Sequence, residues 1–219
     1  MAKSRCQLKV CCIASVEEAR LAVELGADHL GLVSAMPSGP GVISDERIAE
    51  IAAGAPEHIG TFLLTSLFDA EAILSQLRLT GANHVQLVDR VAPGAHAAIR
   101  RAFPAVRIVQ VVHVTGPAAI EEAREAAPWV DLILLDSGNP ALAVKELGGT
   151  GRTHDWGLSR RIVETCGKPV FLAGGMESGN VSAALQSVGP HGIDVCSGVR
   201  TNGALDARKL RALVTAMGA

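Results

Sequence analysis

Two adjacent cysteines, Cys11 and Cys12, end the first apolar run of the chain in the segment KVCCIAS. A thiolate can take a proton as a general base, but free cysteine is also a small residue that proteins often bury. Asp136 ends another apolar run, LILLD. Its carboxyl group could donate a proton or merely cap the loop that follows. The residue types therefore suit proton transfer, and packing and capping remain open alternatives.

Glycines and a serine follow two later apolar runs. Gly174 and Gly175 come after the first of these runs, and Ser197 and Gly198 come after the second. Glycine leaves neighbouring backbone N–H groups unobstructed, so that they can bind an anion such as phosphate. A glycine pair after a strand usually serves only a turn. Two such segments at consecutive strand ends predict a phosphate site.

Short apolar runs alternate with amphipathic segments along the whole chain, which is typical of parallel strands covered by helices on the outside. Ser15 and Asp69 are N-cap candidates of two of the helices, and Gly26 ends the first one. Eight strand-then-helix units without a linker predict one (β/α)8 barrel domain over residues 1–219. The expected strands are 8–13, 29–34, 58–64, 84–88, 106–112, 130–136, 169–173 and 193–196.

The segments that follow the strands form the active site in a barrel of this kind. The glycine-rich segments then follow strands seven and eight, where such barrels often bind phosphate. A long connection containing GGTGRTHDW follows the sixth strand, and its composition favours a lid over an ordinary surface loop. His29 and His84 begin the second and fourth strands, at the other end of the barrel, so we interpret both as structural.

Composition excludes several classes of function. The net charge of −2 and an aromatic content of 3% argue against a nucleic-acid partner. The sequence contains no apolar stretch long enough to span a membrane and no signal peptide at its start. Five cysteines, at positions 6, 11, 12, 166 and 196, show neither disulfide spacing nor zinc-ligand spacing. We therefore expect a cytoplasmic protein with free thiols and no bound metal, and the oligomeric state stays open.

Five segments together resemble phosphoribosylanthranilate isomerase, an enzyme of tryptophan biosynthesis: KVCC, LLD, GGTGRTHDW, LAGGM with NVSAAL, and GIDVCSGVR. The similarity runs from about residue 7 to the last helix. It implies a (β/α)8 barrel, an Amadori rearrangement of a phosphorylated sugar substrate, and no cofactor. In that family the cysteine of the first strand is the general base and the Asp of the sixth is the general acid.

The resemblance assigns these roles to Cys11 and Asp136, while Cys12 stands where the family has glycine. Alternation of side chains along a strand then predicts that Cys11 faces the barrel interior and that Cys12 faces the helix layer or the loop. The predicted phosphate-binding residues are Gly174, Gly175, Ser197 and Gly198.

Two departures concern the substrate. Gly41 replaces a family Arg that holds the arylamine end, and Val88 with Asp89 replaces His-Gly. Arg90 or Arg152 could supply the missing charge. The expected substrate-binding positions are Gly41, Val88, Asp89, Arg90, Gly149 and Arg152. Three readings stay open: this isomerase or a close analogue, another barrel isomerase or lyase acting on a phosphorylated sugar, and a non-catalytic binder of phosphorylated ligands.

Overall fold

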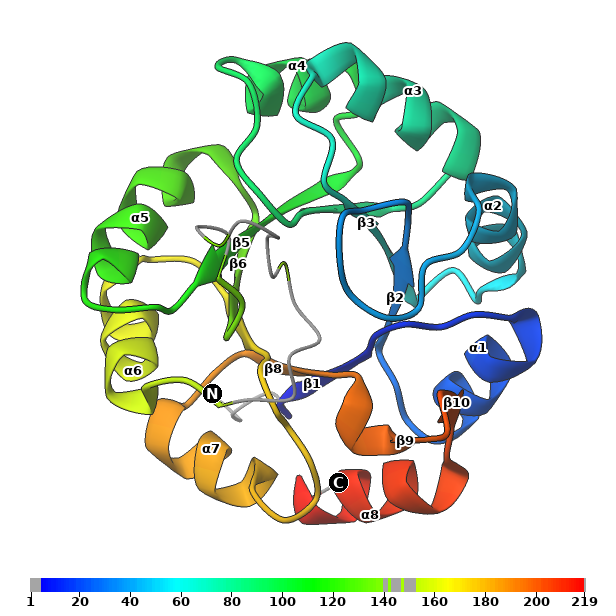
Figure 1. The fold of residues 1–219 in the computed structure, drawn as a ribbon, viewed down its shortest axis with the longest axis vertical. Coiled ribbons are helices and arrows are strands. Elements are labelled where there is room, and N and C mark those ends of the chain that lie inside the picture. Colours follow the sequence, from blue (N-terminus) through cyan, green and yellow to red (C-terminus); the bar gives the residue numbers. More distant parts are fainter. Residues whose placement is uncertain (1–4, 140–141, 143–146, 148–152, 219) are drawn as a thin grey trace.

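The computed structural model describes residues 5–139, 142, 147 and 153–218, and its main sheet is a closed barrel of eight parallel strands. Each strand pairs with the next along the chain, and β8 pairs with β1 to close the ring. The helices surround the barrel, as the view down the barrel shows (Figure 1). The predicted (β/α)8 fold is confirmed.

The strands of the barrel are β1 (Gln7–Val10), β2 (His29–Val33), β3 (Gly60–Thr65), β4 (His84–Leu87), β5 (Arg107–His113), β6 (Leu132–Asp136), β7 (Val170–Leu172) and β8 (Gly192–Val195). The α-helices are α1 (Val16–Glu24), α2 (Asp45–Gly54), α3 (Ala70–Thr80), α4 (Ala95–Ala102), α5 (Ala118–Ala126), α6 (Trp156–Thr165), α7 (Val181–Val188) and α8 (Ala207–Ala216). Two short 3-10 turns, Ala127–Trp129 and Ser197–Val199, complete the helical elements of the described chain.

Side-chain caps set the start of several helices. The predicted caps Ser15 and Asp69 accept hydrogen bonds from backbone N–H groups in the first turns of α1 and α3. Asp155 does the same for α6. These bonds satisfy N–H groups that have no partner inside the helix. The helix starts therefore follow from the local sequence.

Two apolar layers build the core. The larger one fills the space between the strands and the helices, with residues such as Leu30, Ile48 and Ile99 completely buried. The smaller one lies inside the barrel and includes Phe62 and Phe171. Side chains alternate along each strand, so β2, β3, β5, β6 and β7 contribute apolar residues to both layers. This explains why these strands read as nearly continuous apolar runs. Strands β1, β4 and β8 instead direct Lys9, Gln86 and Asp194 into the barrel.

The first strand ends earlier than the sequence predicts, at Val10 instead of Ile13. Cys12 adopts a left-handed backbone conformation with φ of 64°, which a strand cannot contain. The third strand starts at Gly60 instead of His58, because a turn closed by the Ile59 N–H and the Pro56 carbonyl precedes it.

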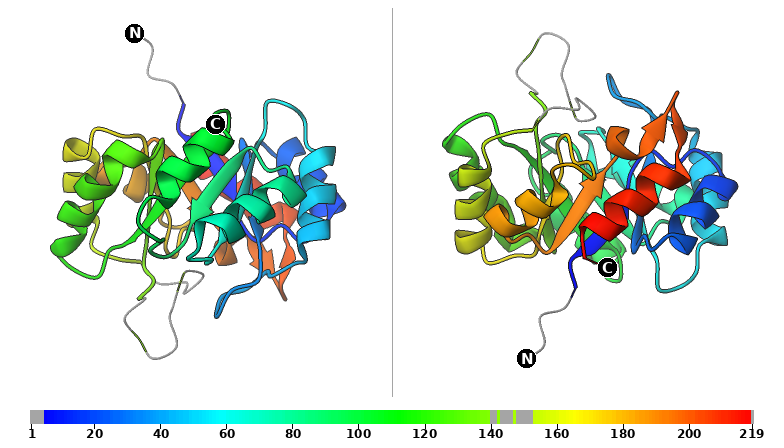
Figure 2. Two further views of the ribbon diagram at one scale, coloured as in Figure 1. Left: turned by 90° about the horizontal axis from the view of Figure 1, so that it is seen from above. Right: turned by 90° about the horizontal axis from the view of Figure 1, so that it is seen from below.

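A small hairpin, which the sequence analysis did not predict, follows the 3-10 turn after β8. It pairs β9 (Arg200–Thr201) with β10 (Ala204–Leu205) in antiparallel fashion, outside the barrel. The hairpin and the loop after β2 project from the same end of the barrel (Figure 2). That end carries the candidate site.

The opposite end of the barrel is closed by aromatic side chains. His84 stacks on Phe62 with ring centroids 4.2 Å apart, and His29 packs edge-on against both rings. Both histidines thus have the structural position that the sequence analysis proposed.

Within the described ranges, no helix is long and apolar enough to cross a lipid bilayer, and no three metal-ligating side chains gather at one point.

Candidate active site

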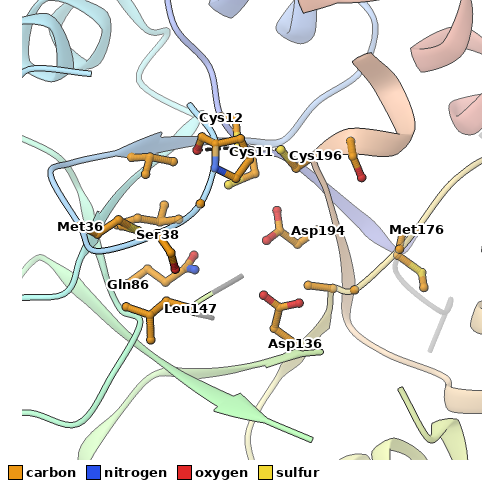
Figure 3. Close-up of a pocket in the computed structure, with 18 residues that line it drawn as sticks. Cys11, Cys12, Met36, Ser38, Gln86, Asp136, Leu147, Met176, Asp194 and Cys196 are labelled. Carbon is orange, nitrogen blue, oxygen red and sulfur yellow. Dashed lines mark hydrogen bonds between the residues drawn. The ribbon is translucent and has the colours of Figure 1, made fainter. Parts of the chain in front are cut away.

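A pocket of about 630 Å³, measured out to its open mouth, lies at the C-terminal ends of the strands. Its walls come from the segments after β1, β2, β6, β7 and β8 together with side chains of the barrel interior. Figure 3 shows three thiols at one side and the Asp136 carboxylate facing them, with Asp194 between.

Cys11 faces this pocket from the end of β1, as predicted, and is almost completely buried. Its Sγ and the Lys9 Nζ both lie over Gly31 of β2. A Cβ at Gly31 would come within 2.7 Å of Cys11 Sγ and 3.1 Å of Lys9 Nζ. Glycine at this position thus leaves room for a thiol and an ammonium group to lie close together.

Lys9 forms an ion pair with Asp194 inside the barrel, with 2.9 Å between Nζ and Oδ1. The two residues are direct neighbours in the β1–β8 pairing. Burial alone would lower the pKa of Lys9, but the Asp194 carboxylate and the nearby Cys11 thiol raise it overall. Lys9 therefore provides a permanent positive charge beside Cys11.

Asp136 ends β6 and faces the same pocket. Burial raises the pKa of its carboxyl group. The hydrogen bond that Ser137 N–H donates to Oδ1, 2.7 Å long, opposes this effect, and the Asp194 carboxylate raises the pKa further. A buried carboxyl group that keeps its proton can act as a general acid.

Cys12 faces the pocket and the loop after β2, not the helix layer. Its left-handed backbone turns the side chain inward, where its Sγ donates to the Pro40 carbonyl over 3.5 Å. Its sulfur also lies 2.6 Å from that of Cys196. Of the two directions that the sequence analysis left open, the structure shows the loop.

The four predicted phosphate-binding residues meet where the segments after β7 and β8 approach each other. Gly174, Gly175 and Ser197 line the pocket, and Gly198 lines an adjoining hollow. A Cβ at Gly198 would lie only 2.0 Å from the Met176 carbonyl oxygen, so the close approach requires glycine. In the described chain, none of these four backbone N–H groups donates to a protein acceptor.

The described residues among the predicted substrate-binding positions do not line the pocket together. Gly41 packs against Cys12 behind the pocket wall, and Val88 is buried in the barrel interior. Asp89 accepts a hydrogen bond from the Arg90 N–H, and Arg90 borders a separate outer hollow beside Trp129. Gly149 and Arg152 lie outside the described residues, as does most of the expected lid.

The sequence analysis missed Asp194 and Gln86 as pocket residues. The sequence did contain an indication for Asp194, because it is a charged residue within an apolar strand. Lys9 is a second charged residue of this kind. In a closed barrel the first and last strands are neighbours, so two opposite charges in them predict a buried pair. Gln86 gave a weaker signal, as an amide within the short fourth strand.

The chain matches the sequence profile of N-(5'-phosphoribosyl)anthranilate isomerase over residues 8–216. It is 36% identical over 206 residues to N-(5'-phosphoribosyl)anthranilate isomerase 2 of Methanosarcina mazei, with 93% of this chain and 90% of the relative covered. It is 35% identical over 212 residues to the isomerase of Haloferax volcanii, with 96% and 92% covered.

Solved structures agree. The crystal structure of phosphoribosyl anthranilate isomerase from Thermus thermophilus superposes with a TM-score of 0.81 at 26% identity, covering 97% of this chain and 98% of that one. A phosphoribosyl anthranilate isomerase in complex with reduced 1-(o-carboxyphenylamino)-1-deoxyribulose 5-phosphate superposes with a TM-score of 0.77 at 25% identity, with the same coverage.

Proposed function

Because the chain belongs to the N-(5'-phosphoribosyl)anthranilate isomerase family, an intramolecular isomerase family of aldose–ketose type, we propose that its pocket carries out an Amadori rearrangement with Cys11 as general base and Asp136 as general acid. The observation that carries this proposal is that both groups face one pocket from β1 and β6. The proposed place of the reaction is the biosynthesis of tryptophan, in the cytoplasm.

The proposed chemistry needs one proton delivered and one removed. Asp136 protonates the ring oxygen of the phosphoribosyl group, so that the C1–O bond breaks and an imine forms. Cys11, as a thiolate, takes the proton from C2, and the resulting enolamine becomes the ketose. The raised pKa of Asp136 favours the protonated acid, and the ammonium group of Lys9 lies beside the proposed base.

The substrate phosphate is proposed to bind the backbone N–H groups of Gly174, Gly175, Ser197 and Gly198. Both loops turn their backbone toward one place, and glycine conformations with φ of 82° and 63° at Gly174 and Gly175 allow that path. Bound there, the sugar would extend from the loops toward Asp194, Asp136 and the thiols.

A second candidate substrate is a phosphoribosyl arylamine that lacks the carboxylate. The observation behind it is that the described lining of the pocket contains no lysine or arginine side chain that could pair with a carboxylate. The side away from the glycine loops presents Met36, Leu147 and Gln86. Such a surface suits an uncharged ring better than an anionic one.

Steady-state kinetics on purified variants test the acid–base pair. Cys11→Ala and Asp136→Asn should each lower kcat/KM for phosphoribosylanthranilate by at least about a hundredfold, the scale of a lost general acid or base. Cys166→Ala removes a buried thiol outside the pocket and is the matched control. Retention of activity in either active-site variant contradicts the assignment of that residue.

The two substrates are separated by comparing phosphoribosylanthranilate with phosphoribosylaniline. A much lower KM for the aniline compound supports the second candidate. A clear preference for anthranilate would mean that a cation from outside the described residues holds the carboxylate.

A further inference from the structure

Three thiols converge at one wall of the pocket, although proton transfer requires only one. Cys11 and Cys12 come from the turn after β1, and Cys196 follows the last residue of β8. The sulfur atoms of Cys12 and Cys196 lie 2.6 Å apart, against about 2.05 Å for a disulfide bond. Little movement is needed to join them.

The backbone at both cysteines directs this contact. Cys12 has φ of 64°, which turns its side chain toward the end of β8. Arg200 donates to the carbonyl oxygens of Cys11 and Cys12 and so holds the turn against the segment that carries Cys196. The contact between the Cys12 and Cys196 thiols therefore joins two segments that Arg200 holds together.

The two thiols differ in acidity. Hydrogen bonds to Cys11 and Cys196, together with burial, raise the pKa of Cys12, which therefore keeps its proton. The contact with Cys12 lowers the pKa of Cys196 despite its burial, and the Arg200 guanidinium adds to this effect. A thiolate beside a protonated thiol is the arrangement in which one sulfur reacts first and the other resolves the product.

The remaining cysteines lack such a partner in the described chain. Cys6 contacts the carbonyls of Gln7 and Pro190, and Cys166 contacts that of Lys168. Neither lines the pocket. Cys196 is only half-buried and borders the pocket, so a small oxidant can reach it from the mouth.

We propose that Cys12 and Cys196 are an oxidative modification site that forms a reversible disulfide with hydrogen peroxide or a small organic hydroperoxide. The Cys196 thiolate attacks a peroxide oxygen. An S–O bond forms, the O–O bond breaks, and water (or an alcohol) leaves after taking up a proton. The Cys12 thiol then attacks the sulfenic sulfur, so that an S–S bond forms and water leaves with the thiol proton. The two thiols are oxidised, the peroxide is reduced, and a dithiol reverses the change.

The disulfide would remove the thiol group of Cys12, which interacts with Cys11, the proposed base. It would also tie the turn after β1 to the segment that leads into the proposed phosphate loop. The site thus couples oxidation to the environment of Cys11 without consuming that thiol.

The test measures the cross-link itself and is independent of catalysis. Reduced full-length protein is treated with stoichiometric hydrogen peroxide, blocked with N-ethylmaleimide, digested without reductant and analysed by tandem mass spectrometry. We expect a peptide pair that joins the segment of Cys12 to that of Cys196 and that dithiothreitol separates. Because Cys11 and Cys12 share one tryptic peptide, variants decide between them.

The cross-link should disappear in Cys12→Ser and Cys196→Ser and persist in Cys11→Ser and in the control Cys166→Ser. Alanine replaces serine at any position where serine prevents folding. The proposal is overturned if the cross-link persists in Cys12→Ser. It is equally overturned if Cys12 and Cys196 stay fully alkylated, or if they are oxidised only to sulfinate without joining.

Discussion

Burial of the Asp136 carboxyl group makes the stability of the fold depend on pH. Its pKa is raised above the value of 3.8 expected in an unfolded chain, chiefly by burial. The folded protein therefore holds this proton more tightly than the unfolded one, and the stability contribution of Asp136 falls as pH rises above about 3.8. At neutral pH the buried carboxyl group therefore lowers the stability of the fold, and the proposed role as general acid would account for its burial.

We expect Asp136→Asn to raise the free energy of unfolding at pH 7 while it removes activity. The amide oxygen can still accept the Ser137 N–H, so the local structure is kept. Urea unfolding of both proteins at pH 7 and pH 4 measures the difference, which should shrink at pH 4. An equal difference at both pH values would mean that the carboxyl group does not titrate in this range.

Gly41 packs closely against Cys12. A Cβ at Gly41 would lie 2.5 Å from Cys12 Cβ, and Gly41 has φ of 78°. Restoring an arginine at position 41 alone thus meets both a clash and a strained backbone. The glycine at 41 and the cysteine at 12 fit each other.

A double-mutant cycle tests this fit. Gly41→Arg alone should destabilise the protein by about 2 kcal/mol or more, while Cys12→Gly should cost little, because it relieves a left-handed non-glycine residue. The double variant should be more stable than the sum of the two changes predicts, by about 1 kcal/mol. Additive free energies of unfolding would show that the contact does not limit residue 41.

At the scale of elements, an ion pair fixes the turn that carries Cys11 and Cys12. Arg200 of β9 bonds to both oxygens of Glu18 in α1 at 3.1 Å, and it also donates to the Gly203 carbonyl. Glu18 accepts in turn from the N–H groups of Ala14 and Leu205. The small hairpin β9–β10 therefore anchors the first turn of the active site.

We expect Arg200→Ala to cost about 2 kcal/mol, because it removes the charged hydrogen bonds to the half-buried Glu18 carboxylate and to the carbonyls of the turn. The exposed pair Arg47–Glu50 is the matched control, and Arg47→Ala should cost less than about 0.5 kcal/mol. Urea unfolding provides both values. If the two arginine variants lose the same small amount, Arg200 does not anchor the turn.

At the scale of the whole molecule, the aromatic end of the barrel makes stability depend on pH. Burial lowers the pKa of His29 to about 4 and that of His84 to about 3. In an unfolded chain histidine titrates near 6.5. Between these values the unfolded chain binds more protons, so stability falls as pH drops below about 6.5.

Replacement of His29 by glutamine should flatten the fall in stability between pH 6.5 and 4, even if the variant is less stable at pH 7. Chemical unfolding at half-unit pH steps measures the two slopes. The control replaces His58, an exposed residue of the loop before β3. An unchanged slope in His29→Gln would assign the pH dependence to other groups.

The whole barrel was predictable because its signals are local. Apolar runs recur eight times, caps such as Ser15 mark the starts of several helices, and each unit needs only its neighbours. The site was predictable where residues end a strand, as with Cys11 and Asp136. It was not predictable where loop conformation decides, as with the left-handed turn at Cys12 or the outer position of Arg90. Those positions depend on contacts between segments far apart in the chain.

The pairing of Lys9 with Asp194 has a consequence for synthesis on the ribosome. Lys9 lies in the first strand of the barrel and Asp194 in the last, so the ammonium group has no carboxylate partner at this position until β8 has been synthesised. A nascent chain that ends before β8 has an open strand edge at β1 in place of a closed barrel. Synthesis of β8 therefore completes both the ion pair and the ring of strands.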